Sequence, residues 1–206
     1  MAADHDTRDG TVAVVVPIKA FERAKGRLSE HLDPDQRRDL AESMAAGVVD
    51  AARRDGFAVI VVTDDDEVEA WARARGADVT RPTVIGLDAA ADAGVAAAAA
   101  RGWSVVVIAH ADLPYATTFA HLTDRSADLV LVPDRHHDGT NVLVTDVDSD
   151  FTFHYGPGSL QRHIGEAARR SLTVEIVDDP ALAWDVDVPA DLPTDRTVAV
   201  EGTAER

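Results

Sequence analysis

Four short, continuous apolar runs constrain the fold of this chain more than any other feature. They occupy residues 12–16, 57–62, 105–109 and 129–133, and each is followed directly by proline or polar residues. Strands that are buried on both faces of a parallel sheet have this unbroken apolar pattern, whereas strands with one wet face alternate. The runs therefore predict a central sheet whose strands are largely parallel.

Helical segments separate these runs. Asp33 is a natural N-cap and Pro34 suits a first turn, so we expect a helix that ends near Arg54. Further helices are expected over residues 67–75, 88–101 and 159–170, and weaker strands over residues 77–80, 142–145, 172–177 and 184–188. Alternating strands and helices indicate the α/β class.

We therefore predict a single Rossmann-like α/β domain with a mostly parallel central sheet flanked by helices. The expected domain spans residues 11–195, between a disordered tail at residues 1–10 and a flexible tail at residues 196–206. In open α/β sheets, ligands bind outside the carboxyl ends of the strands. The polar residues that follow residues 16, 62, 109 and 133 should then line one cleft.

Composition excludes several classes of function. The net charge of −17 argues against nucleic acid binding, which needs a basic surface. No apolar run approaches the roughly 20 residues of a membrane span, and residues 1–11 lack the features of a signal peptide. The absence of cysteine excludes disulfides, thiolate metal sites and a cysteine nucleophile. We expect a cytoplasmic protein that does not associate with membranes.

One basic segment stands out from this acidity. The chain has 18 arginines and only two lysines, and both lysines lie in one segment with Arg23 and Arg27. A basic loop with a glycine after a buried strand can bind a triphosphate, so Lys19, Lys25 and Arg27 are candidate nucleotide ligands. The alternative is a solvated turn. The segment is not a Walker motif.

Two aspartates are candidate ligands for Mg²⁺, which prefers one or two carboxylates together with phosphate oxygens and water. Asp112 follows the third apolar run directly and precedes Leu113-Pro114. Asp185 and Asp187 are two residues apart and therefore lie on the same side of the last expected strand. One of them could complete the metal site with Asp112. Asp112 could instead cap a helix, and Asp187 could be an ordinary edge-strand residue.

A second anion site is expected from glycines and hydroxyls. Asp-Gly-Thr-Asn ends at residue 141, and Tyr-Gly-Pro-Gly-Ser ends at a predicted helix start. Backbone N–H groups at a helix N-terminus, together with the hydroxyls of Thr140 and Ser159 and the open backbone at Gly156, would suit a phosphate or a carboxylate. The alternative is a plain glycine turn with an N-cap. His163, one turn further along this helix, could face the same anion.

Taken together, these motifs resemble the guanylyltransferases of coenzyme F-420 biosynthesis that act on 2-phospho-L-lactate or phosphoenolpyruvate. The resemblance runs from about Val12 to Leu192. The motifs that carry it are Val-Pro-Ile-Lys, Ala-Lys-Gly-Arg-Leu-Ser, Ala-Asp-Leu-Pro, Asp-Gly-Thr-Asn, Tyr-Gly-Pro-Gly-Ser-Leu-Gln-Arg-His and Asp-Val-Asp-Val-Pro-Ala-Asp-Leu. Each motif is weak alone, but their order and spacing together are specific.

The resemblance implies the nucleotidyltransferase version of the Rossmann-like fold and a role for each candidate residue. Thr140, Gly156 and Ser159 would contact the phosphorylated acid, Asp112 and Asp187 would bind metal, and Lys25 and Arg27 would meet the nucleotide phosphates.

Two positions depart from the family pattern. Asp88 stands where the family usually has asparagine, on the expected nucleotide side, and His154 stands where the family often has arginine. Either change could retune substrate binding.

The implied reaction joins GMP from GTP to phosphoenolpyruvate or 2-phospho-L-lactate, with Mg²⁺ as cofactor and pyrophosphate as the leaving group. The acceptor phosphate is already anionic, so the protein needs to supply only position and charge neutralisation. The sequence leaves two alternative functions open. One is a nucleotidyltransferase that uses CTP or acts on a molybdopterin or sugar phosphate, and the other is a non-catalytic nucleotide-binding protein.

Overall fold

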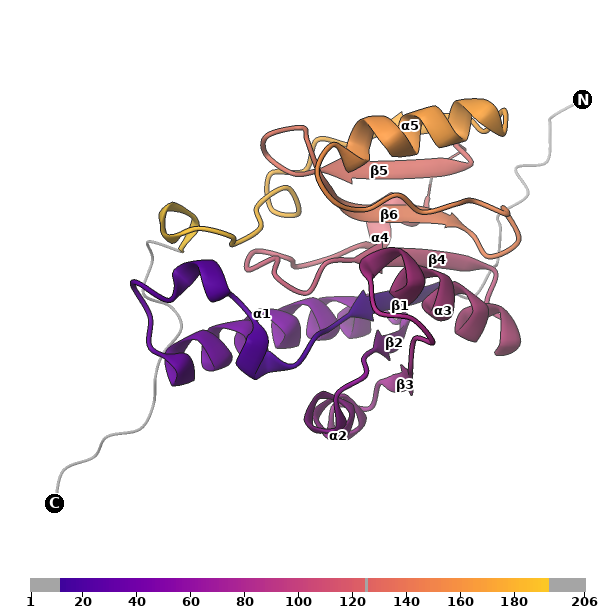
Figure 1. The fold of residues 1–206 in the computed structure, drawn as a ribbon. Coiled ribbons are helices and arrows are strands. Elements are labelled where there is room, and N and C mark those ends of the chain that lie inside the picture. Colours follow the sequence, from indigo (N-terminus) through magenta and orange to yellow (C-terminus); the bar gives the residue numbers. More distant parts are fainter. Residues whose placement is uncertain (1–11, 125, 193–206) are drawn as a thin grey trace, which may run out of the picture.

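A computed structural model describes residues 12–124 and 126–192 as a seven-stranded sheet covered by helices (Figure 1). The strands are β1 (Val12–Pro17), β2 (Ala58–Val62), β3 (Asp78–Thr80), β4 (Val105–Ala109), β5 (Leu129–Pro133), β6 (Thr140–Asp146) and β7 (Val174–Ile176). The helices are α1 (Pro34–Arg54), α2 (Asp66–Ala74), α3 (Leu87–Ala100), α4 (Ala120–Thr123) and α5 (Ser159–Arg169). Three short 3-10 helices are η1 (Phe21–Arg23), η2 (Gly26–Leu28) and η3 (Pro189–Asp191).

The sheet has the strand order β3-β2-β1-β4-β6-β5-β7. The pairs β2–β3, β1–β2, β1–β4 and β5–β7 are parallel, whereas β6 is antiparallel to both of its neighbours. The prediction of a mostly parallel sheet flanked by helices is therefore confirmed. Because β6 runs the opposite way, its first residue, Thr140, lies at the same edge as the carboxyl ends of the parallel strands.

The long helix begins as the sequence predicts. The Asp33 side chain accepts a hydrogen bond from the Gln36 backbone N–H at 2.8 Å, and the Gln36 side chain accepts one from the Asp33 N–H at 3.0 Å. This reciprocal capping box satisfies two N–H groups that the helix leaves free, and Pro34 occupies a position that needs no donor. The other three predicted helices and the predicted strands up to residue 177 are also present, with ends shifted by a few residues.

One predicted strand is wrong, and one described α-helix was not predicted. Residues 184–188 do not form a strand. Their only ladder-like contact is the bond from the Val186 N–H to the Asp112 carbonyl at 3.3 Å, and Pro189 then starts η3. No pattern in the sequence predicts α4, which has only four residues. The predicted tails at residues 1–10 and 196–206 lie outside the described residues, as do both ends of the predicted domain.

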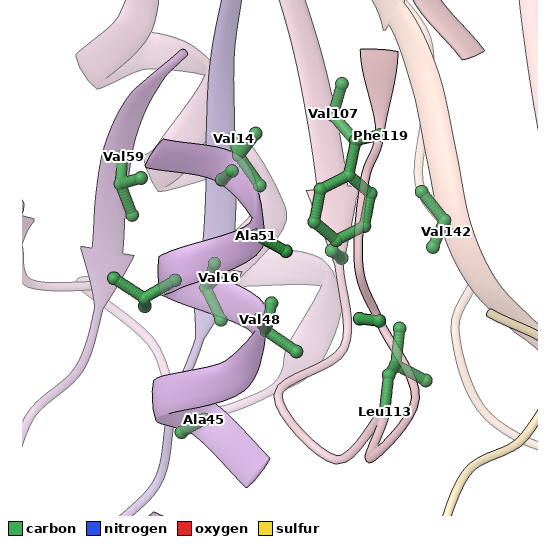
Figure 2. Packing of buried hydrophobic residues seen from close by; sticks show 14 of the residues in the cluster. Val14, Val16, Ala45, Val48, Ala51, Val59, Val107, Leu113, Phe119 and Val142 are labelled. Atoms are coloured by element: carbon green, nitrogen blue, oxygen red, sulfur yellow. The ribbon is translucent and has the colours of Figure 1, made fainter. Parts of the chain in front are cut away.

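Alternation along β1 divides the core between the two faces of the sheet. Val14 and Val16 pack against α1 on one face, together with residues such as Val48 and Phe119 (Figure 2). Ala13 and Val15 point to the other face, which is covered by α3 and α5. Both faces are dry, which explains why the strand sequences are unbroken apolar runs.

The alanine-rich helix α3 lies unusually close to β1. A Cβ atom placed at Gly94 would stand 2.2 Å from the Val15 Cγ1 atom, so only glycine fits at this crossing. The side chains around this contact are small, since Ala90, Ala91 and Ala98 are buried on the same helix. None of the described helices combines the length and apolar character that a membrane span requires.

Candidate functional site

A cleft of about 530 Å³ opens at the carboxyl ends of β1, β2 and β4, and we call it the carboxyl-edge cleft. Its walls come from the segments after these three strands, from the start of α3 and from the segment that precedes η3. The prediction that polar residues after residues 16, 62 and 109 share one cleft is confirmed. The residues after residue 133 do not line this cleft, because β6 lies between β4 and β5 and moves that strand end away.

The basic loop, residues 19–28, forms one wall of the cleft. It is made of η1 and η2, and the buried side chains of Phe21 and Leu28 anchor it to the core. Lys25 adopts a left-handed backbone conformation with φ of 55° between the two 3-10 helices. The loop places both lysines of the chain in the cleft wall.

The three predicted nucleotide ligands of the basic loop occupy different environments. Lys19 is exposed and lines the cleft, whereas the side chain of Lys25 is only 9% exposed. Arg27 is 74% exposed, is absent from the cleft lining and pairs with Asp187 at 3.1 Å. The structure therefore brings Lys19 and Lys25 into the cleft and leaves Arg27 at its rim.

Lys25 joins the two aspartates that the sequence singles out as metal ligands. Its Nζ donates to the Asp112 Oδ2 at 2.5 Å and to the Val186 carbonyl at 2.5 Å, and it lies 3.9 Å from the Asp187 Oδ1. Segments that are far apart in the chain therefore meet at a single ammonium group. In this arrangement Lys25 neutralises the carboxylates.

The environment of Asp112 distinguishes the two roles proposed for it. Burial raises the pKa of the Asp112 carboxyl, but the charges of Lys25 and His110 and the hydrogen bond from Lys25 outweigh burial and hold the pKa below its usual value. The Oδ1 atom is buried and has no partner. No helix begins at Asp112, since the next described helix is α4, so this residue is not a helix cap.

A partly buried, ionised carboxylate with one unpaired oxygen at the cleft fits a divalent cation. Within residues 12–124 and 126–192, no three His, Asp or Glu side chains are gathered as a complete ligand set. Oxygens from a bound phosphate would have to complete the coordination, as is usual for Mg²⁺.

The second aspartate segment is fixed by a residue that sequence reasoning did not select. The buried carboxylate of Asp191 accepts hydrogen bonds from the N–H groups of Asp187 and Val188, each at 2.8 Å, and pairs with Arg135. Asp185 also lines the cleft, and burial raises the pKa of its carboxyl, as do the nearby charges of Asp112 and Asp187. The extended segment before η3 thus presents two carboxylates to the cleft without forming a strand.

The hydroxyls of Thr140 and Ser159 meet in a buried cluster with His163. The Thr140 Oγ1 lies 3.1 Å from the His163 Nδ1, and the Ser159 hydroxyl donates to the Thr140 Oγ1 at 3.4 Å. The His163 Nε2 accepts a hydrogen bond from the His154 N–H at 3.0 Å, so in the neutral ring the proton resides on Nδ1 and is donated to Thr140. The Thr140 hydroxyl accepts both bonds and keeps its own proton for another acceptor.

The glycine loop before α5 has conformations that favour glycine. Gly156 has φ of 102° and Gly158 has φ of 71°. Arg162 holds the loop by donating to the carbonyls of His154 and Tyr155 at 3.2 and 2.8 Å. β6 runs beside the Asp112 segment, because the His110 N–H bonds to the Asn141 carbonyl at 3.0 Å, but Thr140, Gly156 and Ser159 are absent from the residues that line the carboxyl-edge cleft.

Asp88 connects α3 to this glycine loop. Its Oδ1 accepts a hydrogen bond from the Tyr155 N–H at 2.6 Å, and Asp88 is absent from the residues that line the cleft, although Gly86 and Leu87 are present. The oxygen of an asparagine side chain could accept the same bond. The departure at this position is therefore compatible with the contact that holds the two elements together.

The buried imidazole of His163 predicts a pH-dependent loss of stability. Burial and then nearby cationic groups lower the pKa of His163 to about 4 from 6.5. The unfolded chain binds this proton more tightly than the folded protein does. The free energy of unfolding therefore keeps its full value above about pH 6.5 and decreases by roughly 3 kcal/mol as the pH falls toward 4. Urea unfolding at pH 7 and pH 5 should show a smaller pH effect in His163→Gln than in the wild type.

The exposed His31 provides the control for this measurement. The variant His31→Gln should keep the wild-type difference in unfolding free energy between the two pH values. An equal pH effect in the wild type and His163→Gln would contradict the assignment.

Comparison with known proteins is consistent with this geometry. The chain is 36% identical over 190 residues to a phosphoenolpyruvate guanylyltransferase from Sphaerobacter thermophilus, covering 88% of this chain and 91% of the relative. A protein of the same name from Rubrobacter xylanophilus is 35% identical, covering 88% and 92%. A 3-phospho-D-glycerate guanylyltransferase from Phenylobacterium zucineum is 34% identical and covers 86% of each chain.

Solved structures share the fold at low sequence identity. A structure from Desulfovibrio desulfuricans, described as a nucleotide-diphospho-sugar transferase, has a TM-score of 0.71 at 18% identity and covers 87% of this chain and 83% of its own. The 4-diphosphocytidyl-2C-methyl-D-erythritol synthase of Anaerococcus prevotii has a TM-score of 0.58 at 11% identity, covering 88% and 94%. These likenesses confirm the nucleotidyltransferase version of the Rossmann-like fold. The family described as "Guanylyl transferase CofC like" matches residues 12–202, and the chain belongs to this family of guanylyltransferases.

Proposed function

We propose that this protein transfers GMP from GTP to phosphoenolpyruvate, forming enolpyruvoyl-2-diphospho-5'-guanosine and pyrophosphate in coenzyme F-420 biosynthesis. The observation that carries the proposal is the meeting of both lysines with Asp112 and Asp187 in one cleft of a guanylyltransferase-family chain. The names of the relatives from Sphaerobacter and Rubrobacter favour phosphoenolpyruvate over the other three-carbon acids. We further propose that the enzyme acts in the cytoplasm and does not bind nucleic acid.

The chemistry asks little of the protein beyond position and charge. An oxygen of the acceptor phosphate attacks the α-phosphorus of GTP, a new P–O bond forms, and the bond to the bridging oxygen of the β-phosphate breaks. Pyrophosphate leaves with that electron pair. No general base is needed, because the attacking phosphate oxygen is already anionic. Lys19 and Lys25 in the cleft and Arg27 at its rim would neutralise the phosphates, which is the usual source of catalysis in phosphoryl and nucleotidyl transfer.

Asp112 and Asp187 would hold Mg²⁺. The unpaired Oδ1 of Asp112 and the half-exposed carboxylate of Asp187 supply anionic oxygens, and substrate phosphates would complete the set. When bound, the ion would neutralise charge on the phosphate oxygens. Lys25, which bridges the two carboxylates in the structure, would then be free to donate to a phosphate.

Thr140, Gly156 and Ser159 would form the side of the site that receives the acid. The Thr140 proton has no acceptor in the buried cluster, the Gly156 backbone carries no Cβ, and Ser159 begins α5, whose free N–H groups attract anions. The bond from the His110 N–H to the Asn141 carbonyl joins β6, which begins at Thr140, to the strand that leads to Asp112, and this supports the proposal. The acid and the nucleotide phosphates would therefore meet at the carboxyl end of β4.

Pyrophosphate release tests the proposal. Purified protein is incubated with Mg²⁺, each of GTP, CTP and ATP, and each of phosphoenolpyruvate, 2-phospho-L-lactate and 3-phosphoglycerate, and the products are identified by mass spectrometry. We expect the fastest release with GTP and phosphoenolpyruvate. Faster release with CTP would identify a different nucleotidyltransferase, and nucleotide binding without release from any pair would identify a non-catalytic protein.

A further inference from the structure

We propose that Asp64 selects guanine, by accepting two hydrogen bonds from the N1–H and the 2-amino group of the base. This inference rests on the proposed function and assigns the part of the carboxyl-edge cleft that the phosphates, the metal and the acid do not use. It adds a residue that determines base specificity.

The order of strands sets the direction in which a nucleotide lies. The wall residues follow β4, then β1, then β2, and the loop from β3 to α3 comes last. Neighbouring strands are about 4.8 Å apart, so the end of β2 lies roughly 10 Å from the end of β4. That distance is close to the span from the α-phosphate to the base of a nucleotide. With the phosphates at Asp112 and Lys25, the base therefore reaches the end of β2.

The base end of the cleft is apolar on its sides. Pro82, Ile85, Leu87 and Ala90 line it, and Ile85 is 88% exposed although it is a large aliphatic side chain. A flat purine ring covers such a surface well, and burial of aliphatic area favours its binding. A bound purine base would thus cover the exposed side chain of Ile85.

Asp64 is the first of three consecutive aspartates, and it differs from the other two in its side-chain contacts. Asp65 caps α2 by accepting from the N–H groups of residues 67 and 68, and Asp66 pairs with Arg81. Within the described part of the chain, no group donates to the exposed Asp64 carboxylate, and it alone of the three lines the cleft. Its backbone carbonyl accepts from the Arg81 guanidinium at 3.1 Å, which fixes its position at the cleft wall.

A free carboxylate is chemically matched to guanine. Guanine presents two adjacent donors, N1–H and the 2-amino group, and a carboxylate offers two acceptors at similar spacing. Adenine and cytosine present an unprotonated ring nitrogen on the same edge, which would face the carboxylate as a second acceptor. Specificity is the difference in binding free energy between guanine and these bases. It therefore includes both the attraction of guanine and the repulsion of adenine and cytosine.

The experiment compares Asp64→Asn with the wild type, using GTP, inosine triphosphate and xanthosine triphosphate. Losing a charge-assisted bidentate contact should lower kcat/KM for GTP roughly tenfold to a hundredfold. Inosine triphosphate, which lacks the 2-amino group, should lose less. Xanthosine triphosphate should become a better substrate, because the asparagine amide can donate to its 2-oxo group and accept from its N1–H.

The matched control is Asp148→Asn, which removes one charge from an exposed turn after β6, at the opposite edge of the sheet. It should leave the ratios between the three nucleotides unchanged. Calorimetric titration of GTP into the wild type and Asp64→Asn, without acid, measures the base contact independently of turnover.

The two proposals fail in different ways. Equal GTP dissociation constants and equal nucleotide ratios in the wild type and Asp64→Asn would overturn the role of Asp64, even if GTP and phosphoenolpyruvate react. Absence of product from GTP with all three acids would overturn the proposed function. The titration would still decide whether Asp64 reads the base.

Discussion

Replacing Asp112 by asparagine is expected to reduce turnover by about a thousandfold or more, because several kcal/mol of charge stabilisation in the transition state would be lost. The substitution keeps the size of the side chain and removes its charge. Asp112 lies beside Lys25 with one buried oxygen unpaired, which supports its proposed role as a metal ligand. Turnover is measured with saturating GTP, acid and Mg²⁺, and far-UV circular dichroism confirms folding.

Metal binding gives this prediction a second readout. Mg²⁺ should raise the melting temperature of the wild type, since a ligand that binds only the folded state stabilises it. The rise should be much smaller in Asp112→Asn and Asp187→Asn, and unchanged in the control Asp148→Asn. Near-normal turnover of Asp112→Asn at saturating Mg²⁺, or a full Mg²⁺-dependent rise in its melting temperature, would remove the metal assignment.

Replacing Lys25 by methionine is expected to lower kcat/KM for GTP by at least about a hundredfold, the effect of losing a buried charge that stabilises a phosphate. The same change should destabilise the metal-free protein by up to about 3 kcal/mol, because breaking a largely buried ion pair leaves an uncompensated carboxylate. The side chain of Lys25 is 9% exposed and contacts Asp112 and the Val186 carbonyl. Water therefore has little access to the position that its ammonium group would leave. Added Mg²⁺ should restore part of the stability and none of the turnover.

Arg27 provides the comparison for Lys25. Its guanidinium is 74% exposed, and an exposed pair such as that with Asp187 contributes at most about 1 kcal/mol. Arg27→Ala should therefore have a much smaller effect, confined to GTP, and should not lower the melting temperature appreciably. Lys25→Arg should not rescue activity, because a planar guanidinium does not fit the position of a compact ammonium. Equal losses in Lys25→Met and Arg27→Ala would contradict this distinction.

The sequence was sufficient for the parts of the fold that local pattern determines. Continuous apolar runs marked the buried strands, and the Asp33-Pro34 pair marked the start of α1. The strand predicted at residues 184–188 was wrong because this segment pairs with no strand of the described sheet, although its apolar residues alternate with aspartates. Only Val186 is fully buried there, and it packs against Leu28 and Met44 rather than in the sheet.

The site was predicted less completely, because its important contacts connect distant segments. Lys25 and Asp112 are both visible as candidates, but their direct contact depends on how the basic loop folds back across β4. The support of the second aspartate segment by Asp191 and Arg135 has no local sequence signal, since Arg135 follows β5 and Asp191 lies in η3, far along the chain. The ring tautomer of His163 likewise depends on a backbone N–H from a preceding loop.

The contact between Gly94 and Val15 limits how this enzyme can change its substrates. Because no side chain separates α3 from β1, the start of α3 and the strand that leads into the basic loop are held at a fixed distance. The distance between these two walls of the cleft is therefore fixed. A wider nucleotide could bind only if the whole of α3 moved. Variation in substrate choice should then arise in the loops, where one side chain can be exchanged without moving the frame that carries it.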